Sequence, residues 1–157
     1  MKSRKAVFQI DNFKGAINFF KHMDIIKEYI EQNKEYLDPC EIDFIGQDYT
    51  QLLKIEEVDL IISQYAGFVA QATKQFLKVG GILICNDSHG DATLARFDEG
   101  FKFIGIVDRK NKIQSNNLEN YFKLPKEKPV DLEEMRKKMK GLKYTLAAEN
   151  YLFRKIK

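Results

Sequence analysis

The chain has 157 residues, of which 44% are hydrophobic, and this length predicts one well-buried core in a single domain over residues 1–157. Its 26 basic and 23 acidic side chains leave a formal charge of +3, so no global basic field indicates nucleic-acid binding. The two cysteines, Cys40 and Cys85, form no C-x-x-C pair, which argues against a disulfide or a structural zinc site. Cys85 lies in an apolar run, where cysteine usually behaves as a small buried hydrophobe.

The amino-terminal segment and the hydropathy of the chain predict a cytoplasmic protein without a membrane partner. The apolar part of the first segment, residues 6–10, is shorter than the roughly 7–15 residues of a secretory signal. No stretch approaches the ~18 consecutive apolar residues of a membrane span.

The first third of the chain predicts two strands around one helix. Residues 6–10 (AVFQI) are expected to form a strand that ends at Asp11. Over residues 15–37, apolar side chains recur every three to four positions, which predicts an amphipathic helix. Pro39 closes this helix, and residues 41–46 (EIDFIG) predict the second strand.

The rest of the chain continues this alternation. Strands are predicted at residues 58–62 (VDLII), 82–85 (ILIC), 101–107 (FKFIGIV) and 149–156 (ENYLFRKI), with a further hairpin strand at 112–114. Helices are predicted at residues 68–77, 92–97 and 131–140, and residues 115–129 are expected to form a polar surface excursion. Gly80 and Gly81 are expected to end the helix 68–77, because glycine adopts a left-handed backbone at little cost.

The helix predicted at residues 131–140 has well-marked ends. Asp131 can cap its amino terminus, Glu134 and Lys138 are spaced to form an ion pair, and Gly141 stops it. We interpret its run of basic side chains as a solvated helix face that complements the helix dipole, rather than as a nucleic-acid patch.

Strands that alternate with helices predict an α/β fold with a mostly parallel sheet and helices on both faces. The apolar runs VDLII and ILIC are typical of strands buried on both sides. In such sheets ligands bind outside the carboxyl ends of the strands. The residues that directly follow each strand are therefore the candidates for a functional site.

Asp11 and Asn12 follow the first strand. A carboxylate at this place can accept hydrogen bonds from both hydroxyls of a ribose, as it does in Rossmann-type sheets. The alternative is that Asp11 forms an Asx turn or caps the helix that begins near Gly15.

Gln47, Asp48 and Tyr49 follow the second strand. Asp48 can accept a hydrogen bond from the exocyclic amine of an adenine, while Tyr49 covers a face of the ring. Equally, Asp48 can cap a short helix over residues 49–53, with Tyr49 half buried. Neither interpretation excludes the other.

Ser63, Gln64 and Tyr65 follow the strand 58–62. Their backbone carbonyls and side-chain donors can orient the amine or hydroxyl of a substrate. Such residues are also what any loop between a strand and a helix contains, so this signal is weak by itself.

The run NDSHGD at residues 86–91 is the densest polar stretch to follow a strand. His89 lies within reach of Asp87 and Asp91, and an imidazole oriented by a carboxylate is a credible general base. We expect no metal site, because the second histidine, His22, falls in the first helix. The alternative is a hydrogen-bonded turn that starts the next helix.

Together these segments resemble the class I S-adenosylmethionine-dependent methyltransferases. The matching segments are AVFQIDN (the family's second strand and ribose-binding acid), IDFIGQDY (third strand and adenine-side acid), VDLIISQYAG (fourth strand and substrate-facing loop) and FLKVGGILICND (helix, glycine turn and fifth strand). FKFIGIV and ENYLFRKI would be the late antiparallel pair. The resemblance covers nearly the whole chain and implies a Rossmann-like sheet in the order 3-2-1-4-5-7-6.

The resemblance also implies S-adenosylmethionine as cofactor and an unidentified methyl acceptor as partner. The cofactor would contact Asp11, Asn12, Gln47, Asp48, Tyr49 and Ser63. The acceptor would contact Gln64, Tyr65 and Asn86, with His89 and Asp87 as the catalytic residues.

Two departures from the family pattern qualify this expectation. The first strand and its G-x-G loop should precede AVFQIDN, where only MKSRK stands, so we expect an N-terminally truncated member with weak or absent cofactor binding. The absent strand is central in the family's sheet, and bare strand edges would favour homo-oligomers. The SQYA segment lacks the Asn/Asp-Pro-Pro-aromatic signature, so methylation of exocyclic or amide nitrogens, including that of flipped DNA bases, is not supported.

A non-catalytic α/β interaction module is the second hypothesis, because a fold does not imply a function. An NAD-type Rossmann protein is weaker, since it needs the same glycine loop. On the first hypothesis, the strand ends gather Asp11, Asp48, Tyr65 and His89 around one common hollow.

Overall fold

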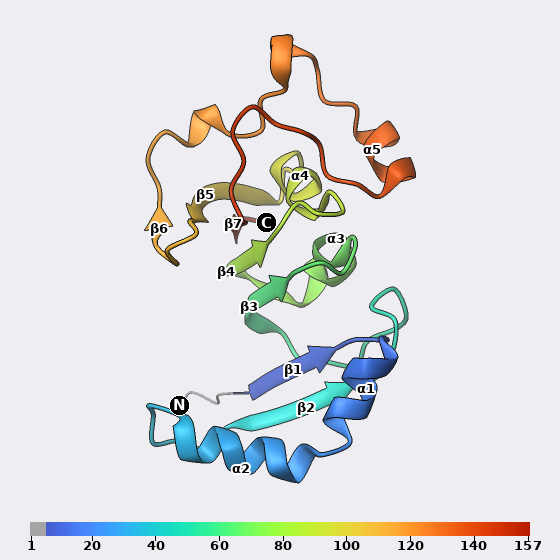
Figure 1. Cartoon of the computed structure of the whole chain (residues 1–157), viewed down its shortest axis with the longest axis vertical. Coiled ribbons are helices and arrows are strands. Elements are labelled where there is room, and N and C mark those ends of the chain that lie inside the picture. The colour runs from blue at the N-terminus through green and yellow to red at the C-terminus, as the bar shows by residue number, and fades with distance from the viewer. Residues whose placement is uncertain (1–5) are drawn as a thin grey trace. The chain divides into compact units, whose positions relative to one another are not determined.

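The computed structural model describes residues 6–157, and the chain divides into two compact units, Met1–Ile55 and Glu56–Lys157 (Figure 1). The first unit contains a sheet of two strands and the second a sheet of five. Each unit therefore presents its own set of strand ends.

The first unit is a parallel strand pair connected by two helices. β1 (Ala6–Ile10) pairs with β2 (Glu41–Ile45) from Ala6 opposite Glu41 to Ile10 opposite Ile45. α1 (Lys14–Phe20) and α2 (Met23–Asn33) lie between them in the chain. Phe20 stacks on Phe44 with 4.4 Å between the ring centroids, so an aromatic contact ties α1 to β2. Because the strands are parallel, both end at the same edge of the pair.

The single helix predicted over residues 15–37 is wrong in two respects. The backbone leaves the helical region at His22, with φ −96° and ψ 43°, so the segment forms two helices. The second helix ends at Asn33, because Lys34 is already extended, with φ −71° and ψ 145°. The apolar spacing indicated the half-buried side of both helices but gave no signal for the break.

The second unit contains the remaining elements of the chain. In order they are β3 (Val58–Ser63), α3 (Val69–Thr73), the 3-10 turn η1 (Lys74–Phe76), β4 (Leu77–Cys85), α4 (Asp91–Arg96), β5 (Phe101–Val107), β6 (Ile113–Gln114), the 3-10 turns η2 (Leu118–Asn120) and η3 (Pro125–Glu127), α5 (Leu132–Lys138) and β7 (Asn150–Lys155). The predicted strands are confirmed, with small shifts of their ends except at β4, which begins at Leu77 and not at the predicted Ile82.

The sheet of the second unit has the order β3-β4-β7-β5-β6 and is mostly antiparallel. Only β3 and β4 run parallel, whereas the pairs β4–β7, β7–β5 and β5–β6 are antiparallel. The prediction of a mostly parallel, Rossmann-like sheet is therefore wrong. A short turn after β5 returns β6 directly beside it, and the excursion before β7 brings that strand back between β4 and β5. Such connections need no crossover helix and produce antiparallel pairs. The antiparallel pairing predicted for FKFIGIV and ENYLFRKI is confirmed.

The core of the second unit lies on one face of this sheet. Leu83 and Cys85 of β4 stand opposite Phe153 and Tyr151 of β7, and all four side chains are at most 1% exposed. The expectation that Cys85 acts as a small buried hydrophobe is thus confirmed. The cluster also includes Ala70 of α3, Ala92 and Ala95 of α4, and Phe122 from the excursion between β6 and α5.

The other face of β3 is open. Leu60 and Ile62 are 46% and 62% exposed, so burial on both sides, expected from the apolar run VDLII, does not hold for this strand. Among residues 6–157, no helix is long and apolar enough to cross a membrane.

The glycine pair predicted to end a helix lies inside β4 instead. η1 ends at Phe76 and β4 begins at Leu77, before either glycine. Gly80 has φ +87°, and the pairing of β3 with β4 shifts register nearby, so the glycines accommodate a bulge in the strand. A Cβ at Gly81 would lie 2.9 Å from the carbonyl oxygen of Lys78, which also requires glycine there.

The predicted start of the helix after the excursion is confirmed, whereas its predicted end is wrong. Asp131 caps α5 by accepting a hydrogen bond from the Glu134 N–H at 2.9 Å, and Lys138 pairs with Glu134. The helix ends at Lys138, because Met139 already adopts a left-handed backbone with φ +45°, so the prediction that Gly141 stops it is wrong.

Candidate functional site

Asp11, at the end of β1, forms the turn that was the alternative to ribose binding. Its Oδ1 accepts the backbone N–H of Phe13 at 2.8 Å. Its own N–H donates to the carbonyl of Ile45 at 3.3 Å, which fixes the end of β1 against the end of β2. Within residues 6–157, its Oδ2 has no hydrogen-bond partner. One carboxylate oxygen therefore holds the turn, and the other is available to a ligand.

Asp48, after β2, also forms a turn. Its Oδ1 accepts the Thr50 backbone N–H at 2.8 Å and the Thr50 hydroxyl at 2.6 Å. Residues 49 and 50 form a turn, not the short helix that was considered. The hydrogen bonds from Thr50 hold the pKa of Asp48 below its ordinary value, so this carboxylate is ionised at neutral pH.

A direct contact joins these two strand ends. Asn12 Nδ2 donates to Asp48 Oδ2 at 3.3 Å, across 36 residues of sequence. Gln47 Nε2 donates to the carbonyl of Leu52 at 3.2 Å and holds the loop that follows. The carboxyl edge of the parallel pair thus carries Asp11, Asn12, Gln47, Asp48 and Tyr49.

In the second unit, Ser63 at the end of β3 is part of a buried structural contact. Its hydroxyl donates to Asp91 Oδ2 at 2.6 Å, and both residues are 3% exposed. The Ala70 N–H donates to both oxygens of Asp91 at 3.1 Å. Ser63 therefore joins β3 to the starts of α3 and α4, which leaves its hydroxyl engaged.

Gln64 and Tyr65 lie on the exposed side of the same strand end. Gln64 Nε2 donates to Asn150 Oδ1 at 2.7 Å, which joins the end of β3 to the start of β7. Tyr65 is 69% exposed and has φ +55°, an uncommon backbone for a bulky residue. Its N–H donates to Asn86 Oδ1 at 3.4 Å. Residues held in such uncommon backbone conformations are found most often at binding and catalytic sites.

His89 is oriented by a serine rather than by a carboxylate. Its Nδ1 lies 2.9 Å from Ser88 Oγ. Ser88 Oγ also lies 2.9 Å from Asn86 Oδ1, to which it donates its only hydroxyl proton. The Nδ1 of His89 must then carry the proton of the histidine–serine bond, and Nε2 keeps its lone pair. Among the described residues Nε2 has no partner, so it is a free proton acceptor.

Asp87 is a partly buried structural carboxylate. It accepts the Thr93 N–H at 2.7 Å and the Thr93 hydroxyl at 2.9 Å. Thr93 Oγ1 also lies 2.9 Å from the hydroxyl of Tyr144. Burial raises the pKa of Asp87 above its ordinary value, and the hydrogen bonds from Thr93 and from the Leu142 backbone offset this only in part. Asp87 therefore fixes the segment after α5 against the loop after β4.

Sequence reasoning missed these partners of the predicted residues. Thr93 and Tyr144 are 51 residues apart, and no local pattern announces their contact. Asp91 was weighed only as a neighbour of His89, whereas it hydrogen-bonds to Ser63 and Ala70. The position of Asp91 as the first residue of α4 was a usable signal, because carboxylates are favoured there.

The predicted site residues thus fall into two groups, one in each unit. The first group lies at the carboxyl ends of β1 and β2 and the second at the carboxyl ends of β3 and β4, with Ser63 opposite Cys85 in register. That the two groups gather around one common hollow stays a prediction. Among residues 6–157, no three side chains of the metal-ligating types could hold an ion together.

Comparisons with known proteins add no family to this picture. No protein-family model matches the chain. No curated protein matches it either. The argument for a function therefore depends on the geometry of the two strand-end groups.

Proposed function

We propose that this chain is an S-adenosylmethionine-dependent methyltransferase, whose first unit binds the adenosine part of the cofactor. The observation that carries the proposal is the hydrogen bond from Asn12 to Asp48, which holds the two strand ends together. Beside it, Asp11 keeps one carboxylate oxygen without a partner among the described residues.

The donor and acceptor pattern at this edge suits an adenosine. Asp11 Oδ2 can accept a ribose hydroxyl, since a carboxylate only accepts hydrogen bonds. Asp48 can accept the exocyclic amine of adenine, and Tyr49 can cover the ring. Asn12 would have to share Asp48 with the ligand, because it already donates to Asp48 Oδ2. Each solvent-exposed hydrogen bond contributes only about 0.5–1.5 kcal/mol, so weak binding is expected.

The methionine part of the cofactor finds less support. The nine glycines of the chain include no G-x-G sequence, which is the motif that lets a backbone approach this part of the ligand. When bound, the cofactor would supply an activated methyl group. We therefore expect the adenosine part to dominate whatever affinity exists.

Part of the strand order implied by the resemblance is present in the second unit, although its sheet is not the mostly parallel one that was expected. Four of its strands pair in the order β3-β4-β7-β5, which corresponds to the order 4-5-7-6 implied by the resemblance. The antiparallel pairing of β7 with β5 is also the one implied.

On this proposal, the second unit would contact the methyl acceptor. His89 Nε2 would take the proton released by the attacking nucleophile, since its lone pair is free. Gln64, Tyr65 and Asn86 would orient the acceptor. Asp87 is hydrogen-bonded to Thr93, so its role would be to position the loop that carries His89.

Isothermal titration with S-adenosylhomocysteine tests the proposal. We expect saturable binding with a dissociation constant of roughly 0.1–1 mM, or about −5 kcal/mol. Asp11→Asn, which preserves the turn to Phe13, should weaken binding severalfold. Asp43→Asn is the matched control, because Asp43 is an exposed acid in the body of β2. Absence of saturable binding, or equal loss in both variants, would reject the proposal.

A non-catalytic interaction module is the second candidate, and the open face of β3 favours it. Leu60 and Ile62 are both more than 40% exposed on this strand, at 46% and 62%. Exposed apolar strands at a sheet edge tend to associate. Sedimentation of the wild type and of the Ile62→Lys and Leu60→Lys variants separates the two candidates. Self-association of the wild type that is lost in the variants, together with no binding of S-adenosylhomocysteine, would favour the interaction module.

A further inference from the structure

The second unit contains an open hollow of about 400 Å³ beside the β5–β6 hairpin. Its apolar lining comes from Ile106, Ala147 and Ala148, and Tyr121 also lines it. Small-molecule sites usually span about 300–1,000 Å³ and combine an apolar lining with a few polar groups. The size of this hollow suits a ligand of amino-acid dimensions.

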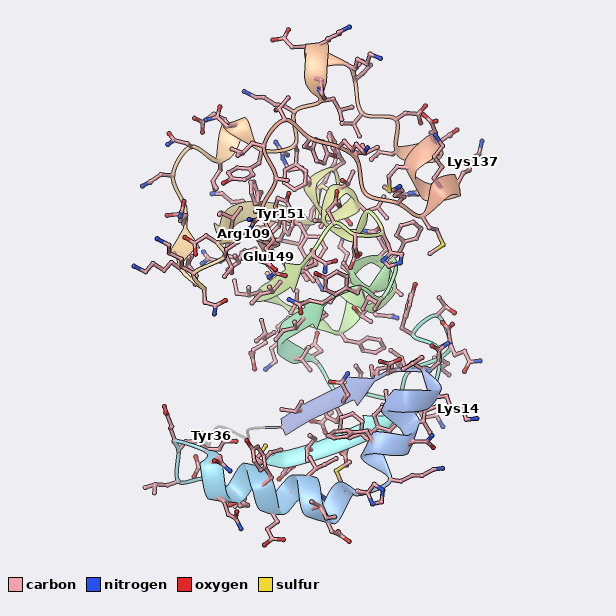
Figure 2. The ribbon with its side chains drawn as sticks, viewed as in Figure 1. Lys14, Tyr36, Arg109, Lys137, Glu149 and Tyr151 are labelled. Carbon is pink, nitrogen blue, oxygen red and sulfur yellow. The ribbon has the colours of Figure 1, made fainter. Side chains whose placement is uncertain are left out.

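Three charged residues line the same hollow: Asp108, Arg109 and Glu149. Arg109 follows β5 and Glu149 precedes β7, and Figure 2 shows both on the side of the second unit where Tyr151 is labelled. Within residues 6–157, neither Arg109 nor Glu149 has a hydrogen bond or an ion pair. A guanidinium and a carboxylate that share a hollow without pairing are both available to a ligand.

A rigid turn presents Arg109. Asp108 accepts the N–H groups of Lys110 and Lys112 at 2.8 and 2.9 Å, and Gln114 Nε2 at 2.8 Å. These bonds hold the pKa of Asp108 below its ordinary value and occupy its carboxylate. Arg109 is therefore the cation of the lining, mounted on a turn that needs little ordering when a ligand binds.

The opposite wall is also fixed. The Tyr151 hydroxyl accepts the Ala148 N–H at 3.0 Å, which anchors the backbone next to Glu149. Tyr121 packs edge to face on Tyr151, with 6.3 Å between the ring centroids. The two charges thus stand on supported backbone with an aromatic ring in the same lining.

We propose that this hollow binds a zwitterionic amino acid with an apolar side chain. Arg109 would bind the carboxylate, since its planar guanidinium matches that group. Glu149 would bind the ammonium, and the apolar side chain would contact Tyr121 and the alanines. The proposal uses residues of the second unit alone and does not depend on cofactor binding.

L-Phenylalanine is the probe, measured by isothermal titration or by chemical-shift perturbation of the 15N-labelled full chain. Phenethylamine keeps only the ammonium and 3-phenylpropionate only the carboxylate, so each serves as a matched partial ligand. We expect L-phenylalanine to bind at least tenfold more tightly than either of them. Equal affinity of all three compounds would overturn the proposal, as would the absence of saturable binding.

Two substitutions test which charged group of the ligand Arg109 and Glu149 each bind. Arg109→Gln should remove the advantage of L-phenylalanine over phenethylamine, and Glu149→Gln its advantage over 3-phenylpropionate. Lys110→Gln is the control, because Lys110 is an exposed cation on the same turn that does not line the hollow. Both test positions are exposed, so circular dichroism should show an unchanged fold. Unchanged binding in both charge variants, or equal loss in the Lys110 control, would contradict the assignment.

Discussion

Ser63 donates its hydroxyl to the carboxylate of Asp91 at 2.6 Å, although 28 residues separate the two in sequence. The contact joins the end of β3 to the start of α4, and both side chains are buried. Burial raises the pKa of Asp91 to about 6, against the lowering effect of the hydrogen bonds from Ser63 and Ala70. Asp91 lies close to a strand end, where a catalytic acid could lie, but its hydrogen bonds make it a structural residue.

This environment predicts a pH-dependent contribution to stability. The pKa of Asp91 in the folded chain, about 6, lies above its ordinary value of 3.8, so the folded state binds the proton more tightly. The contribution is fully present below about pH 4 and is lost as the pH rises through about 6. A shift of this size corresponds to about 3 kcal/mol.

Urea unfolding of the wild type and of Asp91→Asn checks this. The free energy of unfolding of the wild type, relative to the variant, should fall between about pH 4 and pH 7. Using the difference cancels the opposite contributions of acids whose pKa is lowered, such as Asp98 and Asp108. A difference that is flat or that rises with pH would contradict the burial argument.

Gly141 is predicted to be intolerant of any side chain. A Cβ there would overlap the backbone carbonyl oxygen of Asp87, and the Gly141 N–H donates to the carbonyl of Ser88 at 3.2 Å. Gly141→Ala should therefore destabilise the fold by roughly 2 kcal/mol or more, because backbone must move. Gly80→Ala is the comparison, since its Cβ would meet nothing within 4 Å and only its φ of +87° is unfavourable. Equal losses in thermal unfolding would show that the close approach does not matter.

The hydrogen-bond chain from Asn86 through Ser88 predicts the tautomer of His89. Neutral His89 should carry its proton on Nδ1, because Ser88 donates to Asn86 and must accept from the ring. Long-range 1H–15N spectra distinguish the two ring nitrogens. Ser88→Ala should shift the population towards the Nε2 proton, and a wild-type ring that already carries it there would exclude Nε2 as the proposed base.

The strands were largely predictable because their apolar runs are local. VDLII and FKFIGIV are bounded by polar or turn-forming residues, and both form strands near the expected ends. The direction of pairing was not local. Only the resemblance implied that ENYLFRKI enters between β4 and β5, and no pattern within the segment itself indicates it; this insertion makes the sheet mostly antiparallel.

The candidate site was predictable in position and not in role. The rule that polar residues follow strand ends located Asp11 and Asp48, and Asn12, the neighbour of Asp11, donates a hydrogen bond to Asp48. The same rule selected Asp87, whose carboxylate is engaged by Thr93. Which oxygens remain free depends on the hydrogen-bond partners, which are near in sequence for Asp11 and distant for Asp48 Oδ2, and a strand-end pattern does not specify them.

The most direct test of the account is a 1H–15N titration of the chain with S-adenosylhomocysteine, because the central claim is that the ends of β1 and β2 bind adenosine. We predict saturable shifts that concentrate at Asn12 and at residues 47–50, and their loss when Asp11→Asn is combined with Asp48→Asn. The claim would be contradicted by the absence of shifts up to roughly 10 mM ligand, which corresponds to a binding free energy of about −3 kcal/mol. Shifts that concentrate at other residues would contradict it as well.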